Sequence, residues 1–415
     1  MPNAAGPKST RVVWIETVPT PFRCAQHERM CGAMPTVQFH FVYTHSAPDQ
    51  DWRTRPEEGS LSVGVCTTDA IAHQGRVRTW LHAWRKGGRI IREALSPRPG
   101  AVIVSGYADP GRARVIEWCR RSAVPLILQA DSNIECDQAA GIKRLVKTAL
   151  VRRVVRASSA IIVFGSAGRA YFRRYGAADE MIFDVPGECM EDAFRTPATP
   201  PLAALAARLA HDAEASTNAR ADRILFCGRL IDRKRCDLAI AAFVAIAQER
   251  PEWQLLVIGD GPRRLSLQAM VPNDLRNRVR FLGFIEDHQV TAAIFRSSKV
   301  LVHPADNEPW GLIVHEALAA GLGVITTRAV GAAQDMILSA DAGTIVPTGD
   351  LPALAAALRD ATSPERAARF PSAAEASLEA WKSRVDPVRG LRSALTSVGA
   401  MVEVKPLPAA ATSLR

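Results

Sequence analysis

Glu308 and Glu316 are two carboxylates with seven residues between them, in the stretch EPWGLIVHE. The pattern predicts a helix from about Trp310 to Ala320 with Pro309 in its first turn, so that Glu308 precedes the helix and Glu316 lies on its second turn. The first backbone N–H groups of a helix have no partner within it, and such a terminus can bind a phosphate or diphosphate. A carboxylate beside this anion site can accept hydrogen bonds from the hydroxyls of a sugar or ribose.

The backbone donors of this predicted anion site belong to Trp310, Gly311 and Leu312. Gly311 removes a side chain where a ligand must approach the backbone. Gly321 falls where the end of a helix favours a residue with positive φ. The alternative is that Glu308 and Glu316 are solvated charges, and that Glu308 only favours the helix dipole.

A second set of candidate residues is cationic. The apolar run 224–227 predicts a strand that ends at Gly228-Arg229, and Lys234 follows five residues after the arginine. An arginine offers a planar fork of donors and a lysine a point charge, and together they suit a diphosphate. Arg233 and Arg235 compete for the same assignment.

Four motifs follow one another in the C-terminal half of the chain: CGRLIDRK (Cys227 to Lys234), VIGDGP (Val257 to Pro262), FLGFI (Phe281 to Ile285) and EPWGLIVHEALAAG (Glu308 to Gly321). In this order they resemble the C-terminal half of glycosyltransferase family 4, whose members are retaining enzymes with the GT-B fold. Any one motif alone would be a weak signal, whereas the ordered set is a strong one.

The resemblance implies a role for each matching residue. Glu308 is expected to contact the hydroxyls of the donor sugar and Glu316 to hold the ribose. The expected ligand is a nucleotide diphosphate sugar, bound by Gly228, Arg229, Lys234, Pro309, Trp310, Gly311, Leu312, Phe284 and Ile285. The last two border the base through backbone groups, so the base cannot be identified from side chains. No metal or other cofactor is expected, because two cations and a helix dipole can stabilise the departing diphosphate.

Asp131, in the predicted loop after strand 126–129, matches loosely a position that faces the acceptor in family 4. A turn or N-cap aspartate is an equally good interpretation. The loop 19–23 has Pro-Thr-Pro where the family carries a glycine pair, so its contact with the donor stays open. Asp49-Gln50-Asp51 spells a metal-binding DxD, but it lies in a polar loop and we interpret it as a solvated turn.

The 415 residues are 47% hydrophobic and 23% charged, which indicates a globular protein of two domains. Apolar runs at 11–16, 37–44, 102–105, 126–129 and 160–164 alternate with helical stretches at 76–95, 110–121 and 142–156, and this alternation predicts an α/β fold with a parallel, doubly wound sheet. The resemblance adds a second Rossmann-like domain facing the first across a cleft. The predicted organisation is an acceptor-side domain (1–195), a linker (196–222), a donor-nucleotide domain (223–380), a helix that crosses back to the first domain (381–400) and a loose tail (401–415).

The net charge is +10, and residues 1–200 carry 27 basic against 19 acidic residues. Such a field favours an anionic partner, either a membrane surface or a phosphorylated acceptor. The stretch 143–156 interleaves six basic residues with valine and leucine, which is typical of a helix at a membrane interface, although an ordinary packed helix with a solvated face has the same pattern. No nucleic-acid-binding motif is present.

The expected location is the cytoplasm, with peripheral binding to the inner face of the membrane. No run reaches the ~18 apolar residues of a membrane span, the N-terminus lacks an apolar signal core, and the eight cysteines have no metal-binding spacing. The leading hypothesis is a metal-independent retaining glycosyltransferase, of the hexosyltransferase type, that acts on a glycan or lipid-linked acceptor in cell-surface or exopolysaccharide biosynthesis. The alternatives are a sugar-nucleotide epimerase or hydrolase of the same fold and a non-catalytic nucleotide-sugar-binding protein.

Overall fold

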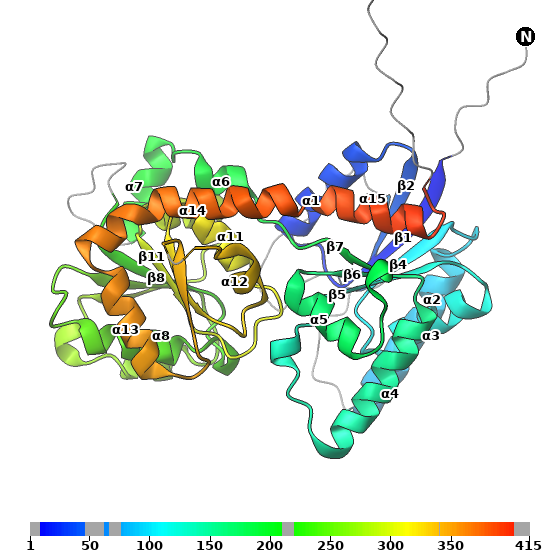
Figure 1. Cartoon of the computed structure of the whole chain (residues 1–415), viewed down its shortest axis with the longest axis horizontal. Helices are drawn as coiled ribbons and strands as arrows, with labels where there is room; N and C mark the ends of the chain where they lie inside the picture. Colours follow the sequence, from blue (N-terminus) through cyan, green and yellow to red (C-terminus); the bar gives the residue numbers. More distant parts are fainter. Residues whose placement is uncertain (1–8, 46–61, 66–75, 210–219, 340, 402–415) are drawn as a thin grey trace, which may run out of the picture.

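The computed structural model describes residues 9–45, 62–65, 76–209, 220–339 and 341–401. These residues form two α/β halves that lie side by side (Figure 1). The first half contains a sheet with the order β3-β2-β1-β4-β5-β6-β7 in which every strand pair is parallel. Its strands are β1 (Thr10–Glu16), β2 (Val37–Tyr43), β3 (Ser62–Val65), β4 (Ala101–Ser105), β5 (Leu126–Ala130), β6 (Ala160–Val163) and β7 (Ile182–Asp184).

The second half contains a sheet with the order β10-β9-β8-β11-β12-β13, also parallel throughout. Its strands are β8 (Arg223–Cys227), β9 (Gln254–Ile258), β10 (Val279–Gly283), β11 (Val300–His303), β12 (Gly323–Thr327) and β13 (Gly343–Val346). The prediction of two Rossmann-like, doubly wound domains is therefore confirmed.

Helices connect the parallel strands. In the first half they are α1 (Pro21–Ala33), α2 (Arg76–Glu93), α3 (Pro110–Arg121), α4 (Gly141–Ala157) and α5 (Ser166–Arg174). Two short helices follow, α6 (Glu191–Arg195) and α7 (Pro200–Leu209). In the second half they are α8 (Cys236–Ile246), α9 (Arg264–Ala269), α10 (His288–Arg296), α11 (Leu312–Ala319), α12 (Gly331–Met336) and α13 (Leu351–Ala361).

Each sheet is covered on both faces, which explains why its strands are apolar without alternation. In β1, Val12 and Trp14 pack into the core on one face, whereas Val13 and Ile15 pack into the core on the other. The second sheet has the same arrangement. Phe194 of α6 lies in a core of the second sheet, although the predicted domain limit places it with the first half.

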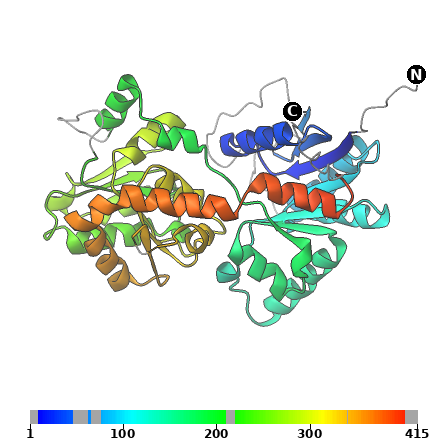
Figure 2. The ribbon, with the colours of Figure 1, turned by 45° about the horizontal axis from the view of Figure 1, so that its top comes forward.

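The C-terminal crossing consists of two helices, α14 (Pro364–Arg384) and α15 (Pro387–Ser397), where a single helix over 381–400 was predicted. Pro387 has no N–H to continue α14, and Asp386 caps α15 instead by accepting from the Val388 N–H. α14 runs along the second half and α15 continues onto the first (Figures 1 and 2). Trp381 is buried in a core of the second sheet, and Leu395 in a core of the first.

Both sheets reverse their strand order at a central pair, β1 and β4 in the first sheet and β8 and β11 in the second. A crevice opens at such a switch point, beyond the carboxyl ends of the strands. Glu16 ends β1, Cys227 ends β8 and His303 ends β11. The topology therefore directs these three residues toward a ligand-binding crevice.

Candidate functional site

A cavity of about 460 Å³ lies between the two halves and is lined by residues of both switch points. This volume is within the range of small-molecule sites, roughly 300–1,000 Å³. The predicted site residues among its walls are Asp131, Gly228, Arg229, Lys234, Glu308, Pro309, Trp310, Gly311 and Leu312. The structure thus brings most of the predicted site to one place.

The ion pair between Lys234 and Glu308 joins the two predicted motifs inside the cavity. Their side chains are only 14% and 13% exposed, so the pair is shielded from water. Burial lowers the pKa of the Lys234 ammonium to about 8, and Arg233 and Arg229 act in the same direction. The Nε2 of His303 lies 3.5 Å from the same Glu308 oxygen, and burial holds the pKa of this imidazole well below its ordinary value. A neutral His303 can donate its Nε2–H toward Glu308.

The start of the helix in this motif differs from the prediction. α11 begins at Leu312, and Gly311 precedes it with φ 94° and ψ 70°, a conformation that needs glycine. Glu308 is held in a bridge to Val330, and the Trp310 carbonyl accepts from the Ala332 N–H. These contacts fix the chain before α11 in a non-helical form.

Pro309 and Trp310 were predicted in the first turn of the helix, and this prediction is wrong. Both residues lie in the loop that leads to the helix. The first helical N–H groups belong to Leu312 and Ile313, which both line the cavity. The anion site at the helix N-terminus moves along the chain by two residues, but its position in the cavity is kept. Gly321 has φ 74°, which confirms the predicted left-handed residue after the helix.

The four cations that follow β8, including Lys234, differ in their contacts. Arg229 and Arg233 both line the cavity, and the Nη1 of Arg233 donates to the Asn307 carbonyl at 3.3 Å. Arg235 instead pairs with Asp237 and Asp306 at 2.9 and 3.0 Å. Of the two neighbours that compete for the phosphate-binding role, Arg233 therefore remains a candidate beside Lys234, whereas Arg235 does not.

The loop after β9 supports the loop after β8. Gly259 has φ 127°, and a Cβ at this position would lie 2.0 Å from the Gly228 carbonyl oxygen. The Leu230 N–H donates to the Asp260 carbonyl at 2.9 Å. This close packing holds the backbone of Gly228-Arg229 at the cavity wall.

Glu316 lies on α11 beyond the walls of the cavity, and it is partly buried. Burial raises the pKa of its carboxyl group to about 7. Burial raises the pKa of the Cys227 thiol and the charge of Glu316 acts in the same direction, so Glu316 lies near the carboxyl end of β8. Glu316 is therefore not a wall of the cavity, although it lies on the helix whose first residues, Leu312 and Ile313, are.

Three other predicted residues differ in their placement. Phe284 and Ile285 follow β10 and are not walls of the cavity that holds the cations, so the structure does not join them to the rest of the predicted site. Asp131 is exposed and lines the cavity from the first half. The N-cap residue of this loop is Asn133, whose side chain accepts from the Glu135 N–H, so Asp131 is not the N-cap of the short helix that follows.

The sequence did not single out a cluster of Glu16, Arg23 and His27 on the first-half wall. Glu16 is 1% exposed, and its Oε2 has no hydrogen-bond partner in the part of the chain that the structure describes. The Nη1 of Arg23 lies 3.8 Å from Glu16, and the Nε2 of His27 lies 3.9 Å from it. Burial lowers the pKa of His27 to about 4. The position of Glu16 at the end of β1 was the only signal that could have indicated it.

Phe22 and Arg23, at the end of the stretch 19–23, lie close to the candidate site. Both line the cavity, and α1 begins at Pro21 directly before them. The loop therefore contributes a further cation to the site from the first half.

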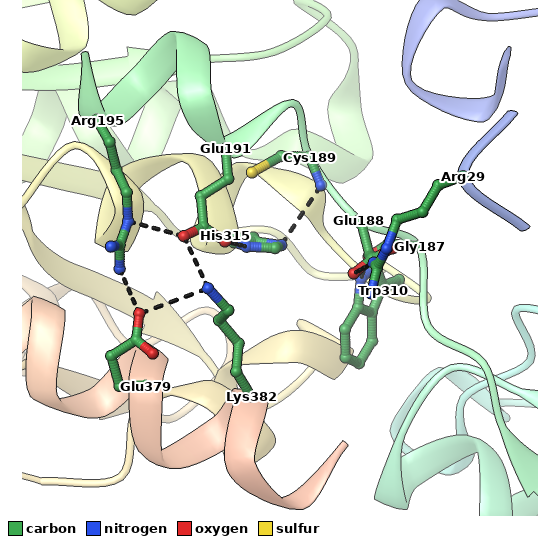
Figure 3. Close-up of polar contacts among 10 residues, drawn as sticks. All are labelled: Arg29, Gly187, Glu188, Cys189, Glu191, Arg195, Trp310, His315, Glu379 and Lys382. Atoms are coloured by element: carbon green, nitrogen blue, oxygen red, sulfur yellow. Dashed lines mark hydrogen bonds and ion pairs between the residues drawn. The ribbon is translucent and has the colours of Figure 1, made fainter. Parts of the chain in front are cut away.

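Trp310 anchors the loop before α11 to the connection between the halves. Its Nε1 donates to the Gly187 carbonyl at 3.0 Å (Figure 3). Its ring packs near Trp381 of α14. Next to it, Glu191 pairs with Arg195, His315 and Lys382. The hydrogen bonds from His315 and Lys382 lower the pKa of the Glu191 carboxyl group to about 2, against the effect of burial. The connection, α11 and α14 are thus tied together behind the cavity.

Among the described residues, none of the helices is long and apolar enough to cross a membrane. No group of three or more histidine, cysteine, aspartate or glutamate residues in the described ranges is arranged to hold a metal ion. Asp49-Gln50-Asp51 lies outside those ranges.

Residues 209–376 match the family model described as glycosyl transferases group 1. The chain is 30% identical over 179 residues to a GDP-mannose-dependent alpha-(1-6)-phosphatidylinositol dimannoside mannosyltransferase of Mycobacterium tuberculosis, which is 43% of this chain and 44% of that protein. The chain is also 33% identical over 138 residues to a phosphatidyl-myo-inositol mannosyltransferase of Mycolicibacterium smegmatis. This match covers 32% of this chain and 34% of that protein. The chain thus matches less than half the length of either relative.

Solved structures match nearly the whole chain. HepE of Anabaena in complex with UDP and glucose has a TM-score of 0.69 at 15% identity over 94% of this chain and 100% of that chain. WaaG, a glycosyltransferase involved in lipopolysaccharide biosynthesis, has a TM-score of 0.65 at 18% identity, with 94% and 100% covered. At these identities the likeness establishes the fold, and it confirms the predicted GT-B architecture.

Proposed function

We propose that this protein is a retaining glycosyltransferase of family 4 that transfers a hexosyl group from a nucleotide diphosphate sugar to a glycan or lipid-linked acceptor, without a metal ion. The observation that carries the proposal is the cavity at the facing switch points, where Arg229, Lys234 and the first turn of α11 surround Glu308. Cations and a helix terminus around one carboxylate suit a donor that has both a diphosphate and a sugar.

The proposed chemistry is electrostatic stabilisation of the leaving group. As the glycosidic bond to the diphosphate breaks, negative charge grows on the phosphate oxygens. Arg229, Lys234 and the N–H groups at the start of α11 are in place to bind this charge before the reaction, which lowers the barrier. Glu308 would bind hydroxyls of the donor sugar and Glu316 the ribose. The similar proteins include a GDP-mannose-dependent mannosyltransferase and a structure in complex with UDP and glucose, which supports a nucleotide sugar and leaves the base open.

The first-half wall is the proposed acceptor side. Asp131 and Glu16 place two carboxylates opposite the cations, and both line the cavity. A buried carboxylate with an unpaired oxygen is favourable only when a donor such as an acceptor hydroxyl reaches it.

A screen of UDP-, GDP- and ADP-sugars by thermal shift tests the donor, since a ligand that binds only the folded state raises its stability. Transfer should then be measured with pooled glycan and lipid-linked acceptors in excess chelator. Loss of transfer that magnesium or manganese restores would contradict the metal-free part of the proposal. Binding of a donor without transfer or hydrolysis on any acceptor would favour a non-catalytic binding protein.

A further inference from the structure

Helices α2 and α4, which both pack against α3, carry most of the large apolar side chains that the described part of the first half exposes. On α4, Ile142 is 79% exposed, Leu145 70% and Val146 64%. On α2, Trp80 is 51% exposed and Trp84 40%, and their rings stack at 5.6 Å. α3 packs against both α2 and α4, so the three helices form one face (Figure 1). Monomeric proteins rarely expose a contiguous apolar surface of this kind without a partner.

The same face is strongly basic. α4 contains six lysine and arginine residues and no acidic residue. Among them, Lys147 forms a close ion pair, 2.8 Å from the largely buried Asp137. Lys143, Arg144 and Arg152 are exposed and have no acidic partner in the described ranges. Since two copies of so basic a face would repel each other, self-association is a poor explanation for its exposed apolar side chains.

A groove of about 950 Å³ runs between the three helices. Its walls combine apolar rings and chains with arginines: Trp84, Trp118, Leu150, Arg120, Arg121 and Arg153. Glu117 is the one acidic residue among its walls, and it is shared by Arg120, Arg121 and Arg153. Such a groove can take an acyl chain against its apolar wall and a phosphate against its arginines.

The groove reaches the acceptor side of the cleft. Tyr107 is one of its walls, and the Tyr107 hydroxyl lies 3.4 Å from the Ser132 hydroxyl. Ser132 follows Asp131, which is a wall of the cleft cavity. The contact between Tyr107 and Ser132 therefore connects a wall of the groove to the residue next to Asp131.

We infer that the face formed by α2, α3 and α4 docks on an anionic lipid bilayer, with its groove around the phosphate and chains of a membrane lipid. The apolar residues enter the interface while the basic residues bind the anionic headgroups, as in other interfacial amphipathic helices. The inference rests on the proposed function only in its consequence, that a lipid-linked acceptor would enter the cleft from this side.

Co-sedimentation with vesicles tests this inference without any transfer assay. The full chain is mixed with vesicles of phosphatidylcholine alone or of phosphatidylcholine with phosphatidylglycerol. We expect at least about tenfold stronger partitioning to the anionic vesicles, and weaker partitioning at high salt because exposed charges are screened over ~8 Å at physiological ionic strength. Equal partitioning to the two vesicle types would overturn the inference.

Matched variants locate the surface. The double variant Ile142→Asn/Leu145→Gln and the double variant Arg153→Gln/Arg156→Gln should each reduce partitioning by about tenfold. Leu265→Gln removes an equally exposed leucine, 80% exposed on α9, and should change nothing. Arg173→Gln/Arg369→Gln removes the same net charge from exposed sites elsewhere and should have the smaller effect. Equal losses from face and control variants would show attraction by net charge alone and contradict the assigned face.

A nucleoside diphosphate thermal shift on each variant separates the two proposals. Unchanged shifts with lost vesicle binding support the docking face, whereas vesicle binding by a protein that transfers no sugar would leave docking intact and contradict the proposed function. If the Ile142→Asn/Leu145→Gln variant changed only the oligomeric state in solution, the face would be a self-association surface and the inference would be wrong.

Discussion

Lys234 and Glu308, 74 residues apart in the chain, form an ion pair at the centre of the cavity between the two sheets. The pair connects the loop after β8 to the loop after β11, the two strands at which the order of the second sheet reverses. A diphosphate that entered the site would offer Lys234 a second anion. Binding of the donor is therefore expected to release Glu308 toward the sugar.

The phosphate cations can be tested by Arg229→Ala and Lys234→Ala. Each variant removes a charge-assisted hydrogen bond of about 1.5–3 kcal/mol, so the affinity for the nucleoside diphosphate identified by thermal shift should fall roughly tenfold or more. Calorimetry measures the effect. Arg263→Ala is the control, because Arg263 pairs with Asp232 and is not a wall of the cavity. Unchanged affinity in both site variants would remove these residues from the phosphate site.

Gly311→Ala should disturb the site and the fold together. Its φ of 94° strains any other residue, and a Cβ there would lie 2.7 Å from Val330 Cγ1 and 3.1 Å from Glu308 Cγ. A strained backbone of this kind costs on the order of 1–3 kcal/mol. Gly349→Ala is the matched control, since Gly349 has φ 79° but open space around its Cβ. Both variants should have a lower Tm, but only Gly311→Ala should also reduce turnover. Equal turnover in the two variants would contradict a role for the position of Glu308.

Glu316→Gln should stabilise the unliganded protein at high pH. Burial raises the pKa of Glu316 to about 7 from an ordinary 4.5, so the folded state holds this proton more tightly than the unfolded state. The stability that this provides is fully present below about pH 4.5 and is lost as the pH rises through about 7. Above pH 7 the buried charge costs on the order of 2 kcal/mol, which glutamine avoids.

Tm measured against pH decides this prediction. The difference between Glu316→Gln and the parent should be positive at pH 8 and shrink toward zero near pH 4.5. Glu375→Gln, at an exposed position of α14, should show no such trend. A difference that does not depend on pH would mean that Glu316 is not ionised at a cost in the folded protein.

Much of the fold could be predicted because buried parallel strands are uninterrupted apolar runs. The runs at 102–105, 126–129 and 224–227 lie within β4, β5 and β8. β7 and β13 were missed, since Ile182-Phe183-Asp184 and Gly343–Val346 are too short to differ from loop residues. The start of α11 was wrong by two residues because its true limit depends on the tertiary contact of Glu308 with Val330, to which no local pattern points.

For the candidate site, too, residues with a local sequence signal could be predicted, whereas residues whose role depends on tertiary packing could not. Residues in local motifs, such as Arg229, Lys234 and Glu308, could be proposed from the sequence because their spacing has a chemical meaning, and they line one cavity. Glu16 was not predicted, because its significance depends on its burial beneath α1. Arg23 and His27, one turn apart on that helix, both lie near its carboxylate. The exposed face of α4 was recognised only as one of two alternatives, because a helical pattern does not say which side the protein covers.

The two glutamates of the first motif should separate in a kinetic comparison. Glu308→Gln keeps the shape of the side chain but removes the charge that pairs with Lys234. An interaction that matters mainly in the transition state appears in turnover, so turnover should fall steeply. Affinity for the nucleoside diphosphate should be kept or raised several-fold, because Lys234 no longer has a competing anion.

Glu316→Gln should instead weaken binding of the nucleoside diphosphate roughly tenfold, through the loss of a charged hydrogen bond to the ribose. Calorimetry with the diphosphate and turnover with the sugar donor, on both variants, give the comparison. If Glu308→Gln abolished diphosphate binding and Glu316→Gln left it intact, the two roles would be exchanged, and if neither quantity changed in either variant, the motif would be structural.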